Sequence, residues 1–103
     1  MTVRIAAALG LVLIAGFAHG AGTTHVVVMD GVKYEPAALR VKRGDTIVWV
    51  NKDPFPHTVT AKGQFDSGSI GVDRRWTLVA RKAGHYAYLC TLHPNMQGSV
   101  DVE

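Results

Sequence analysis

Cysteine is almost absent from this chain, because Cys90 is the only one among 103 residues. An intramolecular disulfide is therefore excluded, and so is a lipid anchor on a cysteine near the N-terminus. In an oxidising compartment, a lone cysteine is a pairing hazard, an inert buried thiol or a metal ligand. The residues that follow Cys90 decide between these roles.

A strong charge of one sign is also lacking, since 11 Lys+Arg stand against 8 Asp+Glu and give a net charge of +3. No dense basic stripe with interleaved aromatics is present, so we expect no nucleic-acid partner. The basic pairs at 42–43, 74–75 and 81–82 lie beside turns and are interpreted as solvated turn residues. The alternative is a mildly basic face that steers an acidic partner. We find no pairing of a nucleophile with a base, and therefore expect no enzyme.

Long hydrophobic runs are missing as well, apart from residues 5–17, which are too short for a span of about 20 residues. This run follows Arg4 and precedes the small residues Ala18 and Gly20. A charged start, an apolar centre and small residues before a cut are typical of a secretory signal peptide. The sequence predicts a signal at 1–20, a mature domain at 21–103, a periplasmic location and no membrane span after cleavage.

No stretch of 11 or more residues has helical periodicity, so the mature chain is predicted to be all-β. We expect about seven or eight short strands in an antiparallel Greek-key sandwich or barrel. Residues 24–29 are predicted to be buried on both faces, and the core is expected to hold the valines and Trp49, Phe65, Trp76 and Tyr86. The predicted strands are 24–29, 37–42, 46–50, 57–60, 75–80, 86–89 and 98–102.

Three soft or borderline metal donors follow one another at intervals of three residues: Cys90, His93 and Met96. A thiolate, an imidazole and a thioether together favour copper. Three donors do not close such a site, so a fourth is expected from elsewhere in the chain.

His57 is the best candidate for the fourth ligand. It follows Pro54 and Pro56, whose fixed φ angles stiffen the loop. His85 begins the strand that ends at Cys90, and at about 3.3 Å per residue it lies some 15 Å away. His25 falls inside the first predicted strand.

The predicted set is His57, Cys90 and His93 in a plane, with Met96 as a long axial ligand. Two histidines, one cysteine and a weak methionine form the blue-copper electron-transfer site. Zinc is the competing metal, because it readily takes cysteine and histidine, but methionine is an unusual zinc ligand.

Several motifs resemble the cupredoxin family, and within it the amicyanins and small plastocyanin-like proteins. They are Val32–Pro36, Leu39–Thr46, Val48–Asn51, Pro56–Thr60, Phe65–Gly68 and Cys90–Gly98. The resemblance covers almost the whole mature chain and implies one copper ion held by His57, Cys90, His93 and Met96. It also implies that the Pro56 carbonyl lies near the metal, on the side opposite Met96.

The resemblance further implies single-electron transfer between periplasmic proteins by a monomer. The expected partners are a cytochrome c or a periplasmic dehydrogenase or oxidase, docking transiently near His93. The alternative is a copper-handling protein, either a chaperone or a buffer. In relatives an Asn or Ser after the first histidine ties the ligand loops together; Thr58 could do so through its hydroxyl. Leu92 and Asn95 depart from the amicyanin pattern beside the expected docking site.

Overall fold

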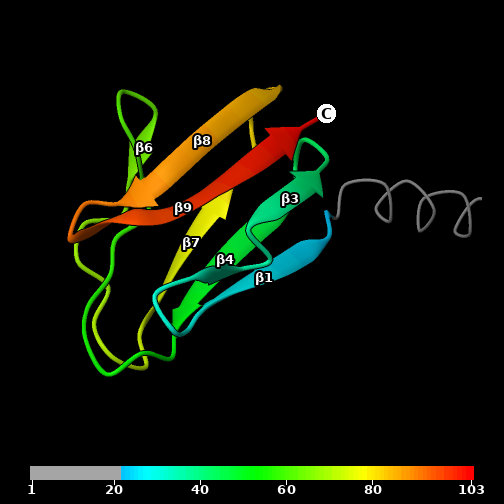
Figure 1. Cartoon of the computed structure of the whole chain (residues 1–103). Helices are drawn as coiled ribbons and strands as arrows, with labels where there is room; N and C mark the ends of the chain where they lie inside the picture. The colour runs from blue at the N-terminus through cyan, green and yellow to red at the C-terminus, as the bar shows by residue number, and fades with distance from the viewer. Residues whose placement is uncertain (1–21) are drawn as a thin grey trace, which may run out of the picture.

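The computed structural model describes residues 22–103, which form nine strands and two packed sheets (Figure 1). The predicted signal at 1–20 lies outside the described residues. Within them, no helix has the length and apolar character that a membrane crossing requires. The strands are β1 (Thr24–Met29), β2 (Tyr34–Glu35), β3 (Ala38–Val41), β4 (Thr46–Asn51), β5 (Thr60–Ala61), β6 (Phe65–Asp66), β7 (Arg75–Val79), β8 (Gly84–Cys90) and β9 (His93–Val102).

The two sheets have the strand orders β2-β1-β4-β7 and β3-β9-β8-β5-β6. The all-β sandwich is thus confirmed. The expectation of purely antiparallel pairing is wrong at two places, because β1 pairs with β4 and β3 with β9 in parallel. In each of these pairs the two strands are not consecutive in the chain, so a crossover connection rather than a hairpin joins them.

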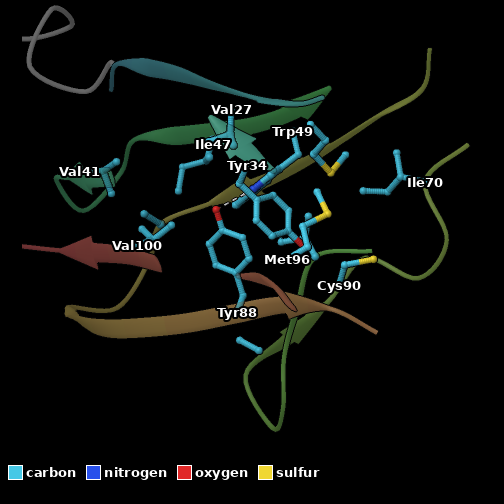
Figure 2. Packing of buried hydrophobic residues seen from close by; sticks show 14 of the residues in the cluster. Val27, Tyr34, Val41, Ile47, Trp49, Ile70, Tyr88, Cys90, Met96 and Val100 are labelled. Atoms are coloured by element: carbon cyan, nitrogen blue, oxygen red, sulfur yellow. Dashed lines mark hydrogen bonds between the residues drawn. The ribbon is translucent and has the colours of Figure 1, made fainter. Parts of the chain in front are cut away.

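The core lies between the sheets and is centred on Trp49, which is fully buried. Its indole N–H donates to the hydroxyl of Tyr88 at 3.2 Å (Figure 2). Tyr34 packs edge-on against Tyr88, with ring centroids 4.7 Å apart. Phe65, Trp76 and Tyr86 were predicted as core residues and are only partly buried, because they close the margins of this aromatic group.

Two local predictions are wrong. Val26 is 52% exposed, although β1 has a neighbouring strand on each side in its sheet. The reason is that only one face of that sheet packs against the core, and Val26 lies on the other face. Residues 57–60 do not form one strand. Instead, His57 makes an isolated bridge with Ile70, and β5 begins only at Thr60.

The topology gathers three chain segments at one end of the sandwich. Strand β4 ends at Asn51, β8 ends at Cys90 and β9 begins at His93. Because β4 leads into the loop at 52–56, that loop and the turn between β8 and β9 lie at this same end. His57 reaches it through the bridge to Ile70.

Candidate metal centre

Three of the predicted ligands meet at this end of the sandwich. The Sγ atom of Cys90 lies 3.6 Å from Nδ1 of His57 and 3.8 Å from Nδ1 of His93. The ligand atoms of the three residues all lie within 4.8 Å of one another. His57 and Cys90 are fully buried, whereas His93 is half-buried.

These distances fit a metal ion. Metal–nitrogen and metal–sulfur bonds of about 2.0 and 2.3 Å, at an angle of about 120°, place the two donor atoms about 3.7 Å apart. The two Sγ–Nδ1 distances lie on either side of this value. The spacing therefore suits a trigonal arrangement, although it does not by itself separate copper from zinc.

Met96, the predicted axial ligand, occupies an irregularity in the pairing of β8 and β9. Leu89 pairs with Gln97, whereas the next residue, Cys90, pairs with His93. The three residues between His93 and Gln97 are therefore looped out of the ladder. Met96 belongs to this loop and is 2% exposed, at the same end of the core as Cys90 (Figure 2).

Asp53 is a site residue that the sequence analysis missed. Its Oδ2 atom lies 2.6 Å from Nε2 of His57, and the carboxylate also accepts hydrogen bonds from the backbone N–H groups of Gly31 and Val32. Burial by itself raises the pKa of Asp53, but the hydrogen bonds from Val32, His57 and Gly31 bring this pKa below its ordinary value.

The ionised Asp53 determines which ring nitrogen of His57 carries the proton. An ionised carboxylate only accepts hydrogen bonds, so Nε2 of His57 carries the proton and donates it. The lone pair of the neutral ring is then on Nδ1, which is the atom that faces Cys90. Such carboxylate–histidine pairs orient metal ligands and make the ligand nitrogen more basic. The signal in the sequence was an acid four residues before the histidine.

Asn51 gives the loop before His57 its shape. Its fully buried side chain donates to the carbonyls of Phe55 and Ile70, at 2.9 and 3.0 Å. Its Oδ1 atom accepts the N–H of Asp53 at 2.9 Å. The side-chain amide of Asn51 therefore binds two backbone carbonyls and one backbone N–H, and it holds Asp53 within hydrogen-bond distance of His57.

Thr58 ties the segments that carry His57 and Cys90 together, as the family resemblance suggested. Its hydroxyl accepts the backbone N–H of Thr91 at 2.9 Å, next to Cys90. Its own N–H points to Sγ of Cys90 at 3.3 Å. Hydrogen bonds to a ligand sulfur reduce its electron donation and tune the potential of a metal bound to it.

The half-buried His93 has apolar neighbours at the surface. Its ring lies 5.4 Å from that of Phe55 and 5.0 Å from that of His57, measured between centroids. Phe55 and Leu92 are 37% and 52% exposed. The structure thus places His93 at the edge of an apolar surface.

The other two described histidines lie outside this cluster. His25 contacts Asp45 at 2.9 Å, and His85 contacts Asp101 at 2.7 Å. Both are held by carboxylates, a partner that the sequence analysis did not foresee. The expectation that His85 lies far from the ligands agrees with its place at the opposite end of β8.

Comparison with known proteins identifies the family. The family model of the cupredoxin-like domain matches residues 3–102. The chain belongs to the cupredoxin-like family. The predicted resemblance is thereby confirmed.

This cupredoxin-like chain is similar to amicyanins in both sequence and structure. It is 38% identical over 88 residues to amicyanin of Paracoccus denitrificans and 34% identical over 84 residues to that of Paracoccus versutus. Each alignment covers 76% of this chain and 64% of the relative's length. A solved structure of an amicyanin variant in the oxidised state aligns with a TM-score of 0.74 and 35% identity, over 82% of this chain and 84% of that one.

Proposed function

We propose that this chain is a type 1 copper protein that carries single electrons between periplasmic redox proteins. The observation that supports this most directly is the convergence of Cys90 Sγ with Nδ1 of His57 and Nδ1 of His93, at 3.6 and 3.8 Å. His57, Cys90, His93 and Met96 would hold the copper ion, which would supply a one-electron couple between its two oxidation states.

The surrounding residues keep the ligands in place during electron transfer. Asp53 and Asn51 fix His57, and Thr58 joins its loop to the segment after Cys90. Ligands that cannot move reduce the rearrangement that accompanies a change of oxidation state. The N–H of Thr58 also donates toward Sγ of Cys90, which helps to set the potential.

In this proposal, His93 would be the route by which electrons reach and leave the bound ion. Its ring is half-buried, and the exposed Phe55 and Leu92 give the surrounding surface an apolar character. A cytochrome c or a periplasmic dehydrogenase or oxidase would dock there transiently. Redox contacts of this kind are small, under about 1,200 Å², so a modest apolar patch on a monomer suffices.

We also propose that residues 1–20 are a signal peptide that directs the domain at 21–103 to the periplasm. Mass spectrometry of the protein secreted by a bacterial host tests the cleavage position. A mature protein that still begins at Met1 would overturn this part of the proposal.

A visible spectrum of the copper-loaded protein tests the function. The wild type and the control His85→Ala should both be intensely blue, since His85 is exposed and pairs with Asp101 away from the metal centre. Cys90→Ser should lose the colour, because the copper–thiolate bond produces it. A colourless wild-type complex that delivers copper to an acceptor protein and exchanges electrons slowly would favour a copper chaperone or buffer instead.

A further inference from the structure

A second feature of the sandwich is a cavity of about 490 Å³ far from the metal centre. It lies at the open side of the fold, where the edge strand β7 faces β6, β8 and β9 without hydrogen bonding to them. Its inner wall includes Ile47 and Val100, which lie at the opposite end of the core from Cys90 (Figure 2).

The lining of this cavity has a consistent chemistry. The inner wall is apolar, with Ile47, Leu78 and Val100 among its members. The charged residues that line it are Arg81 and Lys82, and no acidic residue lines it within the described part of the chain. Small-molecule sites in proteins are commonly apolar cavities of about 300–1,000 Å³ with a few polar groups that fix orientation.

Arg81 and Lys82 are available to a ligand. Both are exposed, and neither takes part in an ion pair among residues 22–103. The hydroxyl of Tyr86, a lining residue, donates to the carbonyl of Lys82 at 2.7 Å. This bond links the backbone of the turn that carries the two bases to the wall of the cavity.

We propose that the cavity binds an amphiphilic anion, namely a straight-chain carboxylate. The alkyl chain lies along the apolar wall and the carboxylate contacts Arg81 and Lys82. Charge complementarity selects an anion, because both charged lining groups are cations. The alkyl chain is required since the remaining wall offers few polar partners. This site is separate from the metal centre and does not depend on the function proposed for it.

Calorimetric titration of the copper-loaded protein tests the proposal, with dodecanoate below its micellar concentration. Acetate and dodecyltrimethylammonium are the comparison ligands, because they lack the chain and the negative charge respectively. We expect saturable 1:1 binding of dodecanoate and at least tenfold weaker binding of both others.

Two variants locate the site. Arg81→Gln/Lys82→Gln removes the cations and should weaken dodecanoate binding by about tenfold or more, as loss of hydrogen bonds to a charged group does. Ala80→Leu narrows the cavity, since Ala80 is a lining residue that is 3% exposed. It should also weaken binding, with an unchanged circular dichroism spectrum as the check on folding.

The matched control is Lys42→Gln/Arg43→Gln. These bases lie on the neighbouring turn, where Gly44 N–H donates to the carbonyl of Ala80, but they do not line the cavity. The control should bind dodecanoate like the wild type. Equal loss in both double variants would overturn the proposal in favour of a general basic surface for a membrane or an acidic protein. Absence of saturable binding, or equal binding of the cationic ligand, would also overturn it.

Discussion

Replacing Asp53 by alanine removes the acceptor of three hydrogen bonds, of which the one to His57 is fully buried and the two to backbone N–H groups are partly buried. The donors are Gly31 N–H, Val32 N–H and His57 Nε2–H, at 2.7, 2.9 and 2.6 Å. Breaking a buried pair by removing one partner typically costs about 3–5 kcal/mol. The backbone donors lie in a surface turn that can reach water, so we expect about 3 kcal/mol of lost unfolding free energy in the metal-free protein.

The same substitution should weaken copper binding. Without its carboxylate partner, the His57 ring loses both its orientation and the preference for a proton on Nε2. Loss of such an outer-shell group typically lowers metal affinity by 10–100-fold. Urea unfolding of the metal-free protein and competition with a copper chelator measure the two effects. Asp30→Ala is the control, because Asp30 is an exposed acid next to Gly31.

The pH dependence gives a further check on Asp53. Its pKa is lowered in the folded protein, so its stabilisation is present above the unfolded pKa of about 4. The stabilisation is lost as the pH falls from there through the lower folded pKa. Asp53→Asn should therefore unfold with a smaller dependence on pH in this acid range. Wild-type copper affinity and wild-type stability in Asp53→Ala would refute the reasoning.

Three other substitutions test separate parts of the structure. Met96→Leu should keep the blue colour and raise the reduction potential measured by voltammetry, because loss of the axial thioether disfavours Cu(II); an unchanged potential would exclude an axial role. Gly98→Ala should cost about 1–3 kcal/mol in urea unfolding, since an added Cβ would lie 2.6 Å from the Tyr88 ring; unaltered stability would contradict this. Hydrogen bonds from Lys42 N–H and His25 lower the pKa of Asp45 to about 2, so its stabilisation should disappear as the pH falls from 4 through 2. Asp45→Asn should remove that part of the acid-unfolding profile, and an unchanged profile would argue against it.

The convergence of the candidate ligands His57, Cys90 and His93 was predictable because their chemistry is local. Cys90, His93 and Met96 stand close together in the sequence, and few residue types can bind copper. The choice of His57 over His85 needed only the length of a strand. The tie made by the Thr58 hydroxyl was suggested by the family resemblance, because relatives often carry Asn or Ser after the first histidine.

The support of the site was less predictable, because it depends on loop conformation. Asp53 reaches His57 only because the Asn51 side chain shapes the intervening residues. An asparagine followed by polar residues and prolines predicts a loop, but it does not predict which side chains and backbone groups will be hydrogen bonded within that loop. Likewise, the two-residue strands β2 and β6 are too short to show alternation, and the exposure of Val26 depends on which sheet face meets the core.

The looped residues between His93 and Gln97 combine an exposed position with a buried one. Regular pairing between β8 and β9 resumes at Leu89 and Gln97. The hydrogen bonding of the two strands beyond that point therefore does not depend on the length of this loop. Within the segment, Asn95 is exposed while Met96 is buried. A substitution at Asn95 would therefore change the surface near His93 while leaving the pairing of β8 with β9 and the buried Met96 in place.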